Sequence, residues 1–175
     1  MNYTLGGAFA SRINMNLREV HGYTYGAGSG YAFYREGGPF LAGGLVRTDS
    51  TAAAAKELIY ELTRFPANPS TPDELKQAMD SSVQSIPARF ETTAATASSI
   101  AALYIRGFAL DYYTTLPDKY RAVTAADVAR VAKEDIRPDN LILLAVGDRA
   151  KIEPALKNSN LGPIEIRSTT GELLK

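Results

Sequence analysis

The stretch LGGAFASRINMNLREVHGYTY, residues 5–25, decides how the N-terminal part of this chain folds. Apolar residues recur in it every four positions, the spacing of one face of an α-helix; they are Leu5, Phe9, Ile13 and Leu17. Gly22 lies just past this stripe, where a helix C-terminus favours glycine. The stretch therefore predicts a helix that ends near Gly22. Arg18 lies at the helix end and Tyr25 at the start of a strand, where both side chains could point into one cleft.

A β-hairpin is predicted directly after this helix. From residue 24 the pattern has a period of two, with larger side chains on one face and Gly26, Gly28 and Gly30 on the other. Residues 36–39, EGGP, predict a turn, and residues 40–48 predict the returning strand. The glycines would let another backbone segment approach the sheet closely.

The rest of the chain has mainly helical patterns. Helices are expected at residues 49–65, 71–90, 93–113, 124–136 and 151–157. The second begins with the capping box Thr71-Pro72-Asp73-Glu74, and Pro87 should kink or end it. Pro117 follows the third helix. These boundaries are set by capping residues at the starts and by prolines near the ends.

Two further strands complete the expected order of elements. Residues 141–146 form a continuous apolar run and predict a buried strand, and residues 164–167 predict an edge strand. Helix, hairpin, several helices, strand, helix and strand in this order are typical of an α+β fold, with an antiparallel sheet packed against several helices. We expect one such domain over residues 1–167 and a tail at residues 168–175.

The composition excludes several classes of function. Lys and Arg (19) balance Asp and Glu (19), so the neutral chain has no overall attraction for nucleic acid or an anionic membrane. No apolar run is long enough to predict a membrane span. The chain has no cysteine and one histidine, which excludes disulfides and makes a self-contained zinc site untenable, since zinc takes three or four His, Cys or carboxylate ligands.

Few residues qualify as a functional site on physical grounds. Gly6-Gly7 lacks the rest of a phosphate-binding motif and is better explained by close packing of the helix. His21 fits a solvent-facing position at the helix end, where the helix dipole favours it. Arg18 by itself would be interpreted as a surface charge. The pattern of the residues around it favours a functional role instead.

The residues from Leu5 to Thr48 match the pattern L-G-G-x-x-x-S-R, then L-R-E-x-x-G-x-x-Y, then a glycine-closed hairpin. This pattern resembles the C-terminal, zinc-free half-unit of pitrilysin-type (insulinase superfamily) metallopeptidases, a family that includes the mitochondrial processing peptidases. Later segments agree with the family and extend the resemblance over nearly the whole chain; they are residues 71–75, 111–113, 123–128 and 144–148. The family usually has a strand before the first helix, which this chain lacks, so we expect it to be trimmed.

The resemblance implies a division of labour between two half-units that enclose a chamber. One half carries the zinc motif H-x-x-E-H, and the facing half carries an Arg and a Tyr seven residues apart, the spacing of Arg18 and Tyr25. By resemblance, Tyr25 would donate a hydrogen bond to the scissile carbonyl or its oxyanion, and Arg18 would hold a neighbouring carbonyl. This chain has no H-x-x-E-H, so zinc is expected on the partner half, and the isolated chain is predicted to have no catalytic residue and no activity.

The leading hypothesis is therefore the substrate-binding half of a zinc metalloendopeptidase. Its expected partners are a zinc-carrying half, in the same polypeptide or another subunit, and a peptide substrate; a homodimer of the isolated domain is also open. The alternative is a non-proteolytic structural subunit with the same fold, and a third is a binding domain unrelated to proteolysis. A bacterial periplasmic location is expected from family habit.

Overall fold

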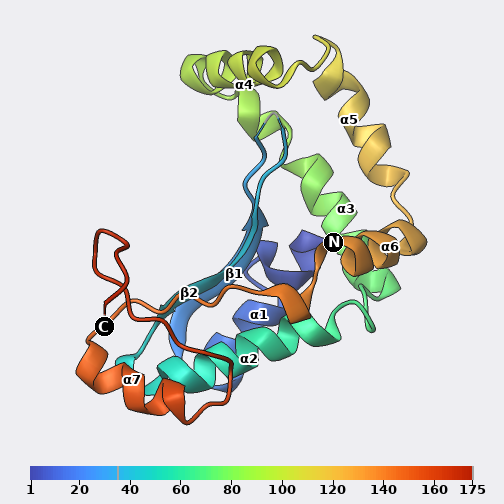
Figure 1. Cartoon of the computed structure of the whole chain (residues 1–175). Coiled ribbons are helices and arrows are strands. Elements are labelled where there is room, and N and C mark those ends of the chain that lie inside the picture. The colour runs from blue at the N-terminus through green and yellow to red at the C-terminus, as the bar shows by residue number, and fades with distance from the viewer. Residues whose placement is uncertain (35, 175) are drawn as a thin grey trace.

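The computed structural model describes residues 1–34 and 36–174, which form seven α-helices and one sheet of two antiparallel strands (Figure 1). The strands are β1 (Thr24–Tyr31) and β2 (Phe40–Val46). The helices are α1 (Arg12–Asn14), α2 (Thr51–Arg64), α3 (Pro72–Gln84), α4 (Thr93–Arg106), α5 (Tyr112–Arg121), α6 (Ala125–Asp135) and α7 (Arg149–Lys157). The expected α+β class is confirmed. The hairpin lies in the middle of a crescent, with α4 and α5 at one end and α7 at the other (Figure 1).

The N-terminal helix is in two pieces, which corrects the single helix predicted from the four-residue spacing. A π-helical turn, Tyr3–Gly7, ends at Ala8, whose backbone is extended (φ −118°, ψ 160°). The chain becomes helical again in α1 and continues into a π-helical segment, Met15–Val20. Because of this break, Phe9 is 70% exposed, whereas the other three residues of the apolar stripe are buried.

The hairpin matches its prediction, with a register running from Thr24 opposite Val46 to Tyr31 opposite Phe40. The ladder is irregular between Thr24 and Ala27, so Tyr25 and Gly26 form a bulge. The N-terminal turn packs closely on β1, because a Cβ placed on Gly28 would lie 2.6 Å from the carbonyl oxygen of Gly6. The close approach of another backbone to the glycine-rich strand is thereby confirmed.

The core lies where α1, α2 and α6 meet the inner face of the hairpin. Its fully buried side chains include Leu5, Ile13, Leu17 and Phe65.

Arg12 connects α3 to this core. Its guanidinium donates to both carboxylate oxygens of Glu74, at 3.0 and 2.7 Å, and lies over the Phe65 ring. Glu74 also completes the predicted capping box with Thr71. The paired Arg12 holds the pKa of Glu74 below its usual value.

The third predicted helix is also divided. α4 ends at Gly107, which adopts the left-handed conformation (φ 70°) that glycine tolerates, rather than continuing to residue 113. Pro117 lies inside α5 instead of following a helix. Pro87 behaves as expected, since α3 ends at Gln84 and a 3₁₀ turn, Pro87–Phe90, follows it.

The apolar run 141–146 is extended but is not a buried strand, which corrects that prediction. Among the residues that the structure describes, no backbone hydrogen bond involves this run. Its alternate side chains are almost fully exposed; they are Ile142 (98%), Leu144 (81%) and Val146 (89%). Residues 164–167 likewise form no strand, although Arg167 makes an isolated bridge to Leu173. The tail folds back at this bridge, and Lys175 of the predicted tail lies outside the described residues.

The contact between Gly28 and Gly6 can be tested with a matched pair of substitutions. Gly28→Ala should lower the free energy of unfolding by about 1–3 kcal/mol, because its Cβ would displace the backbone at Gly6. Gly30→Ala is the control, since nothing lies within 4 Å of a Cβ at that position. Urea denaturation of both variants measures the difference, and equal losses would contradict the packing described.

Hydrogen exchange tests the unpaired state of residues 141–146. In the isolated chain, amides 142–146 should exchange nearly as fast as in an unstructured peptide, while amides of the β1–β2 ladder should be protected. Exchange followed by NMR or mass spectrometry reports both segments in one experiment. Protection of 142–146 equal to that of β2 would show that this run is paired after all.

Candidate functional site

Arg18 lies near the end of the π-helical segment Met15–Val20, as predicted for a helix end. Its guanidinium carbon is 4.4 Å from the centre of the Phe9 ring, a cation–π contact. Nη1 is 3.3 Å from a carboxylate oxygen of Glu19, but this buried nitrogen has no hydrogen-bond acceptor with suitable geometry among the described residues. The side chain is 32% exposed. Stacking and charge thus hold the guanidinium in place without occupying its hydrogen-bond donors.

Tyr25 lies in the bulge of β1, and its side chain is completely exposed. The hydroxyl of Thr24 holds the bulge together, since it accepts a hydrogen bond from Gly26 N (3.0 Å) and lies 2.5 Å from Leu45 O. A bulge redirects the side chains of its strand and commonly lies next to a functional site. The Tyr25 phenol is therefore presented to the outside of the sheet by a specific backbone feature.

Asn14 connects the two elements that carry these side chains. Its Nδ2 donates to Phe9 O at 2.7 Å, and its Oδ1 accepts from Ala27 N at 3.0 Å. Asn14 is 4% exposed, and both of its hydrogen bonds are partly buried. The side-chain amide of Asn14 therefore holds two segments together: the non-helical segment before α1, at Phe9, and strand β1, at Ala27.

The structure brings Arg18 and Tyr25 to neighbouring elements but not into contact. No hydrogen bond between their side chains occurs in the described part of the chain. The arrangement suits a role in which each side chain binds its own group on a third molecule. Their joint action on a substrate stays a prediction.

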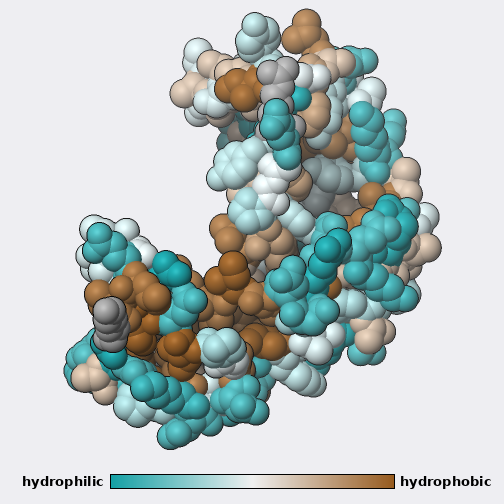
Figure 2. Space-filling view, in the orientation of Figure 1, coloured by the Kyte–Doolittle hydropathy of each residue, from teal (hydrophilic) through white to brown (hydrophobic). Residues whose placement is uncertain are grey.

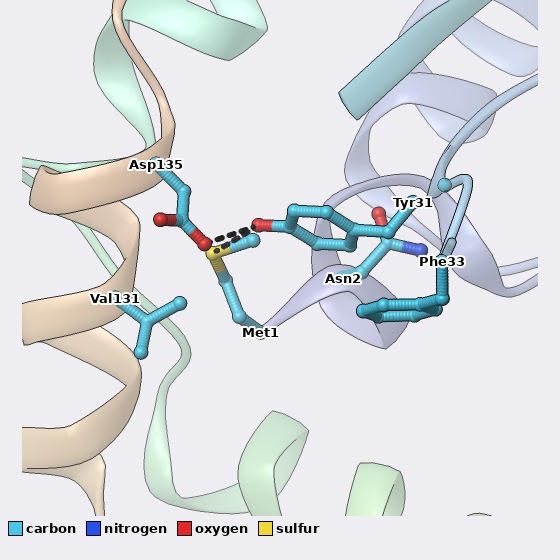
Figure 3. Close-up of a pocket in the computed structure, with 7 residues that line it drawn as sticks. Met1, Asn2, Tyr31, Phe33, Val131 and Asp135 are labelled. Atoms are coloured by element: carbon cyan, nitrogen blue, oxygen red, sulfur yellow. Dashed lines mark hydrogen bonds between the residues drawn. The ribbon is translucent and has the colours of Figure 1, made fainter. Parts of the chain in front are cut away.

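A hollow of about 580 Å³ lies at the opposite end of β1, lined by Met1, Asn2, Gly30, Tyr31, Phe33, Val131 and Asp135 (Figure 3). The Tyr31 hydroxyl donates to Asp135 at 3.0 Å, and the two side chains point toward each other (Figure 3). Burial, and then this hydrogen bond, raise the pKa of Tyr31 well above its usual value. The pair joins α6 to β1. Tyr31 is six residues from Tyr25, or roughly 20 Å along a strand, so the hollow is separate from the Arg18–Tyr25 site.

The single histidine belongs to the surface of the helix end, as expected. His21 stacks on Tyr23 with 4.9 Å between ring centres, and its Nε2 is 3.7 Å from a carboxylate oxygen of Glu57. In the described ranges, no three His, Asp or Glu side chains come together in a way that could hold a metal ion. The residues of this chain therefore do not fit a zinc site. No helix in the same ranges is long and apolar enough to cross a membrane.

Sequence reasoning missed the residues that support the site. The four-residue spacing predicts Phe9 on the same helix face as Leu5, Ile13 and Leu17, and only its contact with Arg18 in the structure shows that it supports the guanidinium. A polar residue directly after Ile13 of the apolar stripe is the available signal for Asn14. A threonine at the strand start is too weak a signal for a bulge at Thr24.

Residues 1–82 match the sequence model of a family described as the peptidase M16 inactive domain. This match confirms the resemblance to the C-terminal, zinc-free half of pitrilysin-type peptidases, and it agrees with zinc on a partner half. No curated protein matches the chain.

Solved structures support the same fold. A peptidase M16 inactive domain from Pseudomonas fluorescens superposes with a TM-score of 0.69 at 22% identity, over 79% of this chain and 33% of that one. A protease from Helicobacter pylori gives a TM-score of 0.65 at 19% identity, over 78% of this chain and 33% of that one. The chain thus spans about a third of the length of these structures.

The role of Asn14 predicts a large effect of its removal. Asn14→Ala removes both hydrogen bonds of a buried side chain and leaves Phe9 O and Ala27 N, which are partly buried, without this partner, so it should lower the free energy of unfolding by about 1–3 kcal/mol. Asn140→Ala is the control, because Asn140 is exposed and should change stability by no more than about 0.5 kcal/mol. Chemical denaturation measures the free energy of unfolding of both variants. An Asn14 variant as stable as the control would show that Asn14 does not hold the two segments together.

Proposed function

We propose that this chain is the substrate-binding half of a two-half zinc metalloendopeptidase. The observation that carries the proposal is that Arg18 and Tyr25 lie on the matched segment, one held by Phe9 and one displayed by a bulge, with donors that no residue of the described chain takes up. A donor left free in this way has a use when a carbonyl-rich ligand supplies acceptors. An extended peptide is such a ligand.

In this proposal each side chain has a separate task. The Tyr25 phenol donates to the oxygen of the scissile carbonyl, where negative charge develops as the bond is attacked; one preorganised donor of this kind contributes about 3 kcal/mol to a transition state. Arg18 binds a neighbouring carbonyl and fixes the position of the peptide, which lowers the entropic barrier to reaction. The zinc ion and the general base belong to the partner half.

The alternative is a structural subunit that uses the same fold without proteolysis. The buried Nη1 of Arg18 favours the substrate-binding role, because it has no acceptor among the described residues and a buried donor without a partner is costly in a purely structural surface. Periplasmic location and the identity of the partner half stay predictions from the sequence.

Reconstitution with a zinc-carrying half tests the proposal. Peptide cleavage should appear only in the mixture, because the described residues of this chain hold no metal site. Tyr25→Phe should lower kcat about 10²-fold, as expected for loss of one donor to the transition state, while the affinity between the halves is unchanged. Cleavage of a quenched fluorescent peptide measures kcat, and light scattering measures assembly.

Tyr104→Phe is the matched control, since Tyr104 is 90% exposed on α4 and should leave kcat unchanged. Equal activity of the Tyr25 and Tyr104 variants would show that the site is wrongly assigned. Assembly of a stable complex that cleaves no peptide would favour the structural subunit.

A further inference from the structure

Leu45 is the residue of β2 that lies across from Tyr25. Thr24 pairs with Val46 and Ala27 with Gly44, so the bulge residues Tyr25 and Gly26 both oppose Leu45. Val46 packs on the core, and alternate residues of a strand face opposite ways, which directs Leu45 away from the core. Its side chain is 94% exposed. A large apolar side chain thus stands unprotected beside the proposed oxyanion donor.

The backbone next to Leu45 is bare on the same strand. Gly43, two residues away, has no atom within 4 Å of a Cβ position, and neither has Gly30 on β1. Leu41, which pairs with Gly30, is 62% exposed. We define the outer face of the hairpin as Tyr25, Gly30, Leu41, Gly43 and Leu45. It consists of two leucines separated by a glycine, a shape that admits another backbone between apolar side chains.

The surroundings of this face suit an apolar ligand. The nearest charged residues along the chain, Arg47 and Asp49, pair with each other at 3.1 Å. Figure 2 shows apolar residues gathered in the hollow of the crescent, where Figure 1 draws the extended residues 141–146 in front of the hairpin. The occupant must also reach Tyr25, whose exposed hydroxyl can donate to an acceptor such as a peptide carbonyl. A peptide chain with apolar side chains meets both requirements.

We infer that Leu45 selects substrates: it contacts the apolar side chain of a peptide residue next to the scissile bond. This inference rests on the proposed function of Tyr25. Leu41 lies four residues from Leu45, about 13 Å along the strand, and side chains of an extended peptide repeat on one side every ~7 Å. A peptide running along β2 therefore places a second apolar side chain on Leu41, four residues from the first. The substrate class is an extended segment with apolar residues at these two positions.

The test uses two peptides that differ only in the residue beside the scissile bond, Leu in one and Ser in the other. The reconstituted wild-type enzyme should prefer the Leu peptide in kcat/KM. Leu45→Thr keeps a residue suited to a strand, and it should lower this preference about tenfold, the scale of one apolar contact. Leu41→Thr should leave the preference for Leu beside the scissile bond unchanged. With a second pair of peptides that differ four positions away, it should weaken the preference for an apolar residue at that position.

Leu110→Thr is the control variant, because Leu110 is 86% exposed and lies between α4 and α5. It should keep the wild-type preference. A Leu45 variant that discriminates between the peptides as well as this control overturns the inference, while cleavage that still depends on Tyr25 leaves the proposed function intact.

A binding measurement on the isolated chain distinguishes a failure of the proposed function from a failure of the Leu45 contact. The Leu peptide should shift the methyl NMR signals of Leu45 in this chain alone, and the Ser peptide should shift them less. If the mixed halves cleave nothing but these shifts occur, the proposed function fails and the contact stands. If the Leu45 methyl signals respond equally to both peptides, the contact itself is refuted.

Discussion

The side chain of Asn14 is the constraint on which the relative placement of Arg18 and Tyr25 depends. Its amide donates to the carbonyl of Phe9 and accepts from the backbone N–H of Ala27, and both hydrogen bonds are partly buried. These two backbone groups would each carry a desolvation cost if left unpaired. The amide satisfies both at once, so the helix that carries Arg18 and the strand that carries Tyr25 are held at a fixed distance. Phe9, placed by the same bond, supports the guanidinium.

The supports of the two donors share one physical property. A ring face attracts a guanidinium without accepting its N–H groups, and a bulge held by a threonine hydroxyl turns a phenol outward without bonding it. Nη1 of Arg18 is buried without an acceptor among the described residues, and the phenol of Tyr25 is exposed to solvent. Both donors are therefore available to a carbonyl-rich ligand. In the proposed function these donors bind and orient a peptide, and the partner half supplies the zinc ion.

Two groups of exposed apolar residues bear on binding, the outer face of the hairpin and the run 141–146. The first lies beside Tyr25, where the inferred peptide would cover it. The second is an extended segment whose backbone groups are unpaired within the described residues, and such an edge is a ready template for strand pairing. The matched structures are about three times as long as the aligned part of this chain.

The sequence by itself determined the elements whose signals are local. The capping box at Thr71, the hairpin and its glycines, and the seven-residue spacing of Arg18 and Tyr25 were all predictable, because each depends on residues close together in the chain. Tertiary structure alone decided three matters. The N-terminal helix breaks at Ala8 because its first turn must pack against β1; Phe9 leaves the core to support Arg18; and residues 141–146 stay unpaired because strand pairing depends on a neighbour that no local pattern specifies. Periodicity gives the face of an element, but only packing determines what covers that face.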